Sequence, residues 1–314
     1  MDQEKKILVI GSGAVGSFYG AILRRAGCAV TFWIRSHSKM ILKSGLTIQS
    51  PLFEMHIPSD CLLTDVSAYQ DTPDYILIAT KVLPEIKVDQ LIKPVIGKNS
   101  VIVLIQNGID IEASLQAAYP NHQVISSLAF IYVTRTQIGH VQHHGNGQLS
   151  MGRYPEGASL AVKTLSGLFE KGGIDCSVTD HCQRDRWKKL VWNAAFNPIS
   201  VITGYQTDKI LSTDQTRAQL IAVMKEVCLV AEKKDIELPD NIIEKMIQTT
   251  EKMAPYKTSM LVDFEENRPI EHEAILGRLI THAERLDCSV PSIKSLYHEL
   301  LACIQRRSCG QKKT

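Results

Sequence analysis

The sequence lacks the signals of several large protein classes. None of its eight cysteines forms a Cys-x-x-Cys pair or a paired Cys/His spacing, which favours reduced thiols in a cytoplasmic protein. No apolar run approaches the roughly 18 residues that a membrane-spanning helix needs. The formal net charge is only +2, which gives no support for binding to nucleic acid or to an anionic membrane. The charged start of the chain predicts no signal peptide.

A metal site is not predicted either. His140, His143 and His144 lie in one glycine-rich stretch, Gly-His-Val-Gln-His-His-Gly-Asn-Gly. No carboxylate or cysteine stands near them to complete a set of ligands. We therefore expect these histidines to serve the structure and not a metal ion.

The most informative stretch is the glycine loop at residues 6–16, Lys-Ile-Leu-Val-Ile-Gly-Ser-Gly-Ala-Val-Gly. An apolar, strand-like run leads into Gly-x-Gly-x-x-Gly, and an apolar helical segment follows it. In a dinucleotide-binding fold, the first glycine permits the turn, the second admits the pyrophosphate and the third lets the helix pack on the strand. The helix N-terminus then offers N–H groups to the phosphates. The residues expected to bind the dinucleotide here are Gly11, Ser12, Gly13, Ala14, Val15 and Gly16.

The pattern of the chain predicts an α/β protein of two domains. Apolar strands alternate with helical segments in the first part, which is typical of a parallel sheet covered by helices. The expected strands are residues 7–10, 30–34, 75–79, 101–105 and 124–130, with a hairpin inside residues 127–152 that turns at Gly145 and Gly147. From about residue 184, apolar residues recur at helical spacing. We expect an N-terminal Rossmann-type dinucleotide-binding domain (1–183) and an all-α C-terminal domain (184–314).

The end of the second strand indicates which dinucleotide binds. NAD-binding units carry an acid there for the ribose hydroxyls, but this strand ends in Arg35, followed by Ser36, His37, Ser38 and Lys39. A guanidinium suits the 2′-phosphate of NADPH, although a solvated basic loop would give the same pattern. Lys81, after the strand at 75–79, is a second candidate for the phosphate or ribose. The predicted cofactor is NADPH.

A polar stripe runs along an otherwise apolar helix at residues 186–200. On a helical wheel, apolar side chains cover most of the circumference. All but one of the strongly polar side chains fall within one sector roughly 80° wide, and they are Arg186, Lys189, Asn193, Asn197 and Ser200; the exception is Lys188. Buried amide and ammonium groups are costly unless paired. The stripe therefore faces a polar cleft, another polar element or a ligand; an internal hydrogen-bond network and a solvent strip are the alternatives.

Three further positions carry less specific patterns. Asn107 follows the strand at 101–105 and suits either a nicotinamide or substrate contact or a simple Asn-Gly turn. Ser259 lies in the helical part. Glu271, taken alone, is typical of a solvated residue near a helix N-terminus.

Over residues 6–306, these motifs resemble in order and spacing one family, the ketopantoate reductases (2-dehydropantoate 2-reductases). The first half matches in the glycine loop, Arg35, Thr80-Lys81 and Gln106-Asn107-Gly108. The more specific matches in the second half are Trp187-Lys-Lys189-Leu, Asn193-x-x-x-Asn197-Pro198, Ser259-Met-Leu-x-Asp263 and Glu271 ahead of Gly277.

What this resemblance implies is an NADP-dependent oxidoreductase. It would reduce 2-dehydropantoate, a small anionic 2-oxo acid, to (R)-pantoate with NADPH, a step toward pantothenate and coenzyme A. By the same resemblance, Lys189 protonates the ketone oxygen and Glu271 assists around the lysine and the substrate hydroxyl. The implied substrate-binding residues are Asn107, Asn193, Asn197 and Ser259, with Asn107 also near the cofactor.

One departure from the family pattern is visible. Thr207 stands where some members have a further substrate-contacting asparagine. The family also contains paralogues with unassigned substrates, so a reductase of a related branched 2-oxo acid is the alternative function. A dinucleotide sensor without turnover is a second alternative, but it leaves the polar stripe without a purpose. The sequence leaves a homodimer open.

Overall fold

The computed structural model describes residues 4–35 and 38–311 and divides the chain into two compact units. The first unit contains the chain up to Gln106 together with Ile111–Gln183. The second contains Asn107–Asp110 together with the chain from Arg184 onward. The segment Asn107–Asp110, predicted as part of the first domain, thus packs with the second unit.

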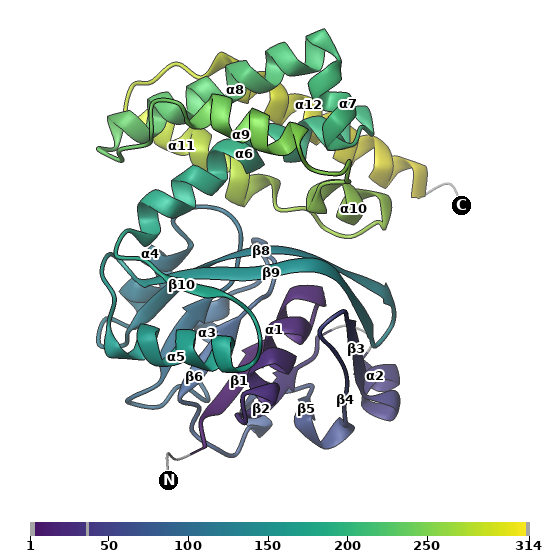
Figure 1. Ribbon diagram of the computed structural model, residues 1–314, viewed down its shortest axis with the longest axis vertical. Coiled ribbons are helices and arrows are strands. Elements are labelled where there is room, and N and C mark those ends of the chain that lie inside the picture. The colour runs from purple at the N-terminus through teal and green to yellow at the C-terminus, as the bar shows by residue number, and fades with distance from the viewer. Residues whose placement is uncertain (1–3, 36–37, 312–314) are drawn as a thin grey trace. The chain divides into compact units, whose positions relative to one another are not determined.

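The first unit is built on one mixed sheet (Figure 1). Its strands are β1 Lys6–Ile10, β2 Ala29–Trp33, β3 Leu46–Ser50, β4 Phe53–Ile57, β5 Leu62–Leu63, β6 Tyr75–Ile78, β7 Val101–Leu104, β8 Val124–Gln137, β9 His140–Arg153 and β10 Cys176–Val178. They run in the order β4-β3-β9-β8-β7-β6-β1-β2-β5, and β10 also pairs with β9. The pairs from β5 to β8 are parallel, as predicted for the dinucleotide-binding half.

Helices cover both faces of this sheet. They are α1 Ala14–Arg25, α2 Ser38–Ser44, α3 Val88–Ile92, α4 Ile111–Ala118 and α5 Leu160–Lys171. Along β1, Ile7 and Val9 join the core formed with α1 and α5, whereas Leu8 and Ile10 join the core formed with α3 and α4. Burial on both faces explains why β1 is an unbroken apolar run and does not alternate with polar residues.

The predicted hairpin exists, but its turn was placed wrongly. Strands β8 and β9 are antiparallel, and Gln137 pairs with His140, so the chain reverses at Ile138 and Gly139. Gly145 and Gly147 lie inside β9, where the register shifts and one strand carries an extra residue. A glycine within a strand marks a bulge as readily as a turn, and the sequence pattern does not separate the two.

The described residues of the second unit form helices and connecting loops, with no strand among them. Its helices are α6 Cys182–Thr203, which begins in the last residues of the first unit, α7 Thr207–Ser212, α8 Asp214–Lys233, α9 Ile242–Glu251, α10 Ser259–Glu265, the π-helical turn η3 Glu273–Gly277, α11 Arg278–Arg285 and α12 Pro291–Gln311. Side chains of α6, α8, α11 and α12 supply most of its core. Among the helices of the described residues, none is both long and apolar enough to cross a membrane.

Candidate active site

The glycine loop joins β1 to α1, and its three glycines meet different surroundings. A Cβ on Gly11 would lie 2.7 Å from the Thr80 nitrogen, and one on Gly16 would lie 2.1 Å from the Gly11 carbonyl oxygen. The close packing of the protein's own backbone therefore requires glycine at positions 11 and 16. An added Cβ on Gly13 would meet no atom within 4 Å, so this exposed glycine leaves open space at the start of α1.

The N-terminus of α1 is suited to an anion. Gly13 is its N-cap, and in the described residues no side chain caps it and its first turn holds no acid. The backbone N–H groups of the first turn, which include those of Ala14 and Val15, can therefore donate hydrogen bonds to phosphate oxygens. The Ser12 hydroxyl donates to the Trp33 carbonyl at 2.7 Å, which ties the loop to the end of β2. These features fit the diphosphate of a dinucleotide.

Two basic residues lie at the same edge of the sheet. Arg35 is exposed two residues beyond β2, and Lys81 lies three residues beyond β6. Because β2 and β6 flank β1 in parallel, their carboxyl ends meet the edge that carries the glycine loop. Gln106 is the next residue along this edge, and its side-chain amide donates to the Thr80 carbonyl at 2.6 Å. The neighbouring donors Ser36 and His37 lie outside the described residues.

The contrast between Gly13 and Gly16 gives a test of the loop. We expect Gly13→Ala to keep the fold, with a stability loss of about 1 kcal/mol or less, and to raise the dissociation constant of the reduced dinucleotide at least about tenfold. Gly16→Ala should cost about 1–3 kcal/mol or more, because its methyl group overlaps the Gly11 carbonyl. Dinucleotide fluorescence titration and thermal unfolding measure the two effects.

Gly167→Ala is the matched control, because Gly167 lies in α5 and an added Cβ there also meets open space. This variant should leave binding unchanged. Equal binding by Gly13→Ala and Gly167→Ala would show that the space at Gly13 is not used by the ligand.

The histidines of the β9 stretch have structural partners. His143 is buried, its Nδ1 lies 2.9 Å from the Ser50 hydroxyl, and burial lowers its pKa. His144 Nε2 lies 2.9 Å from the Thr134 hydroxyl. The described residues hold no cluster of three His, Cys, Asp or Glu side chains that could hold a metal ion.

The polar stripe of α6 lies inside the second unit. Arg186 is 4% exposed, Asn193 8%, Asn197 2% and Ser200 0%, and Lys189 is partly buried. This burial rules out the solvent strip that the sequence allowed. The stripe must therefore find partners within the unit or in a ligand.

Lys189 has the electrostatics of a proton donor. Burial, which penalises the ammonium, lowers the pKa of Lys189 to about 8; the charge of Arg186 acts in the same direction, and the carboxylate of Glu271 opposes both. An amine whose pKa lies near the working pH can release its proton readily. The adjacent Lys188 forms an ion pair with Asp185 at 3.1 Å.

At the C-terminal end of the stripe, only some of the buried polar groups have hydrogen-bond partners within the part of the chain that the structure describes. The Thr258 hydroxyl lies 2.5 Å from the Ser200 hydroxyl, which donates in turn to the Asn197 carbonyl. Thr258 also caps α10 by accepting from the Leu261 nitrogen, and Ser259 is exposed in the first turn of that helix. Asn197 Oδ1, by contrast, is buried without a hydrogen-bond partner among the described residues. A buried amide oxygen of this kind is costly unless a donor reaches it.

The predicted residues fall into two sets. The dinucleotide set (the glycine loop, Arg35 and Lys81) belongs to the first unit. The second unit holds Asn107, Lys189, Asn193, Asn197, Ser259 and Glu271. Within it, the charge of Glu271 acts on Lys189, although the sequence alone gave Glu271 only the pattern of a solvated residue.

Some residues of this region were missed by the sequence analysis. Thr258 shows the weak signal of an N-cap, a threonine ahead of an apolar helix. Thr207, left open above, is 1% exposed, and its hydroxyl accepts from the Tyr256 nitrogen at 3.4 Å. It supports the chain leading to α10, a role that no local pattern indicates.

Two family descriptions match this chain. Residues 7–156 match the family described as "Ketopantoate reductase PanE/ApbA", and residues 181–304 match "Ketopantoate reductase PanE/ApbA C terminal". A 2-dehydropantoate 2-reductase of Nostoc sp. is 31% identical over 318 residues, which cover 98% of this chain and 98% of the relative.

Solved structures resemble the chain over nearly its whole length. A 2-dehydropantoate 2-reductase from Methylococcus capsulatus has 42% sequence identity and a TM-score of 0.88, covering 96% of this chain and 97% of that one. A D-mandelate dehydrogenase, solved with NADH and anilino(oxo)acetate, has a TM-score of 0.86 at 22% identity and covers 95% of this chain and 97% of its own. At that identity the second likeness concerns the fold alone.

Proposed function

Because the chain belongs to the ketopantoate reductase family and is an oxidoreductase, we propose that it reduces 2-dehydropantoate to (R)-pantoate with NADPH. The observation that carries this proposal is the buried stripe of α6. It places an ammonium of lowered pKa, Lys189, on the same helix face as the amides of Asn193 and Asn197. An ammonium and two amides suit a small anionic substrate with a ketone and a hydroxyl group.

Lys189 supplies the proton of the reaction. A bound reduced nicotinamide would supply a hydride to the ketone carbon. As the carbon–hydrogen bond forms, the electron pair of the carbonyl moves to its oxygen, and the Lys189 ammonium neutralises this charge and transfers a proton to it. The products are the 2-hydroxy acid and the oxidised dinucleotide, and the neutral amine of Lys189 regains a proton from water. Glu271 keeps the lysine protonated until this step, because its charge raises the lysine pKa.

Polar groups of the second unit would hold the substrate. The unpaired Oδ1 of Asn197 requires a donor, which the substrate hydroxyl provides. Asn193 and the exposed Ser259 offer donors to the carboxylate and the remaining oxygens. In this proposal, Asn107, which follows β7, contacts the substrate and the nicotinamide.

The cofactor is proposed from the first unit. The open N-terminus of α1 fits a diphosphate, and the exposed guanidinium of Arg35 fits the 2′-phosphate that distinguishes NADPH from NADH. We expect Arg35→Ala to raise the KM for NADPH about tenfold or more and to change that for NADH little, because a charge-assisted phosphate contact contributes about 1.5–3 kcal/mol.

Steady-state kinetics with each dinucleotide measures this change. Lys43→Ala removes another exposed cation of the same domain, from the last turn of α2, and should leave both constants near those of the wild type. If Arg35→Ala weakens NADPH and NADH equally, the arginine does not hold the 2′-phosphate.

A substrate panel tests the proposed reaction against its alternative, a paralogous reductase of another 2-oxo acid. The solved D-mandelate dehydrogenase shares this fold and was crystallised with NADH, so an aryl 2-oxo acid belongs in the panel. We expect the highest kcat/KM with 2-dehydropantoate and a product that co-elutes with (R)-pantoate on a chiral column. A higher kcat/KM with phenylglyoxylate or 2-oxoisovalerate would assign the chain to a paralogue.

A further inference from the structure

The segment Asn107–Asp110 is held by the second unit in a backbone conformation that few residues adopt. Gly108 has a φ of +97° and Asp110 a φ of 56°. A Cβ on Gly108 would lie 2.6 Å from the Ala274 carbonyl oxygen, so the segment runs directly against the turn η3. Ile109 is 1% exposed in the core of the helical unit. The position of Asn107 is thus set from within this unit.

Three side chains of the helical unit hold the segment. Arg186 Nη1 donates to the Gly108 carbonyl at 3.0 Å, and Arg278 Nη1 donates to the Ile109 carbonyl. His282 Nε2 contacts the Asp110 carboxylate. Burial alone would raise the pKa of Asp110, but the hydrogen bond from His282 and the charges of His282, Lys234 and Arg278 lower it. The carboxylate is therefore a charged anchor for the segment.

Arg186 differs from the other two anchors because its charge also acts on Lys189. Its guanidinium is buried, and it donates to the carbonyl of Gly108, the residue directly after Asn107. It lies on α6 three residues before Lys189, so the two cations are neighbours on one helix face. Its charge is one of the causes that lower the pKa of Lys189. One side chain thus connects the Asn107 segment with the lysine.

We propose that Arg186 is a positioning residue of the reductase reaction, which fixes Asn107 relative to Lys189 by binding the Gly108 carbonyl. This inference rests on the proposed function, since it gives Asn107 and Lys189 work at the same substrate. With the anchor in place, the amide of Asn107 keeps one orientation while Lys189 delivers its proton. A displacement of about 1 Å in such a site can cost as much as about 100-fold in rate.

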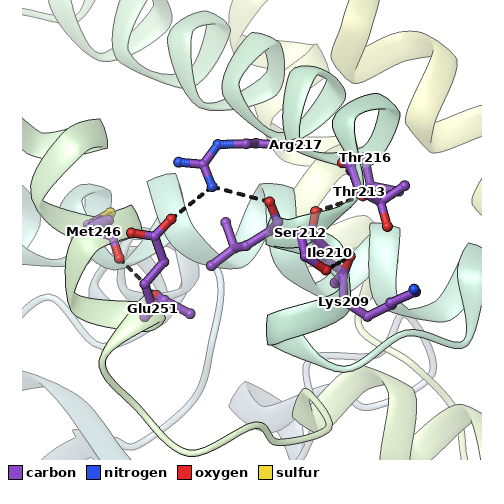
Figure 2. A network of polar contacts seen from close by, with 10 residues as sticks. Lys209, Ile210, Ser212, Thr213, Thr216, Arg217, Met246 and Glu251 are labelled. Carbon is purple, nitrogen blue, oxygen red and sulfur yellow. Dashed lines mark hydrogen bonds and ion pairs between the residues drawn. The ribbon is translucent and has the colours of Figure 1, made fainter.

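Variants of Arg186 separate its two actions. Arg186→Gln removes both the charge and the guanidinium, whereas Arg186→Lys keeps the charge and loses the fork geometry. The matched control is Arg217→Gln. Arg217 Nη1 also donates to a backbone carbonyl, that of Leu211 at 3.1 Å, and to Glu251 at 2.8 Å, in the network between α7, α8 and α9 (Figure 2).

Each full-length variant is measured in three ways. Hydrogen exchange of the peptide containing Asn107–Asp110 reports the anchor, the pH profile of kcat/KM reports the lysine, and thermal unfolding reports stability. We expect Arg186→Gln to speed exchange in that peptide. It should also lower kcat about tenfold or more, with little change in the KM for NADPH. The alkaline limb of its kcat/KM profile should move about half a pH unit or more upward. Arg186→Lys should also speed exchange in that peptide, but the alkaline limb of its pH profile should stay at the wild-type position.

Arg217→Gln should lower thermal stability without either change. The proposal is overturned if Arg186→Gln leaves exchange of the segment and the limb at their wild-type values, or if Arg217→Gln alters them equally. Unchanged exchange in Arg186→Lys overturns it too, which covers the case that the glutamine variant does not fold. Absence of turnover by the wild type with every 2-oxo acid would instead count against the proposed function, while exchange of the segment still reports the anchor.

Discussion

Lys189→Ala is expected to lower kcat by at least about 100-fold, within the usual range for loss of a general acid. The reason is that the proposed mechanism takes the proton from the Lys189 ammonium, so its loss removes both the proton donor and the charge that neutralises the ketone oxygen. Lys189→Met, which keeps the aliphatic stem, should show the same loss, because packing of the stem is not the cause. Single-turnover measurements with saturating NADPH give the rate directly.

Lys188→Ala is the control for this experiment. Lys188 is the adjacent lysine, and it is already paired with Asp185 at 3.1 Å, so its removal should leave kcat within about twofold of the wild type. Near-wild-type turnover by Lys189→Ala would remove the assignment of the proton donor. An equal loss in both lysine variants would point to a general effect of charge on the helix.

The second large effect concerns pH. The proton donor must be protonated, and Lys189 is protonated below its pKa of about 8, so kcat/KM should be level below that pH and fall about tenfold per unit above it. Glu271→Gln removes the carboxylate charge that raises this pKa, and therefore moves the alkaline limb to lower pH. Arg186→Gln acts in the opposite direction.

Profiles of kcat/KM between about pH 6 and 10 for the wild type and Glu271→Gln test this expectation. The conservative change Glu271→Asp keeps the charge and should restore most of the wild-type limb. A limb that stays in place in Glu271→Gln would show that this carboxylate does not act on the lysine.

The parts of the fold that depend on local pattern could be predicted from the sequence. The strand, glycine loop and helix at residues 6–25 carry their signals within a few neighbouring residues. The same holds for α8 (Asp214–Lys233), whose apolar residues recur at helical spacing. The edge hairpin formed by β3 and β4 was not predicted, although polar and apolar residues alternate clearly in both strands.

The site was less accessible to such reasoning because its contacts join distant parts of the chain. The stripe from Arg186 to Ser200 was found because it lies on one helix. Glu271 acts on Lys189 from the segment before η3, so only the family resemblance selected it. Asn107 follows β7 in sequence, but its segment is held in the helical unit by Arg186 and its neighbours. The spacing of apolar residues along the chain does not predict this contact.

The most direct test of the central claim is the loss of reduced-nicotinamide absorbance when the protein is mixed with NADPH and 2-dehydropantoate. We predict rapid oxidation that depends on the substrate, is slower with NADH and is lost in Lys189→Ala. Tight binding of NADPH without oxidation, with 2-dehydropantoate present at millimolar concentration, would contradict the assignment as a ketopantoate-reducing enzyme.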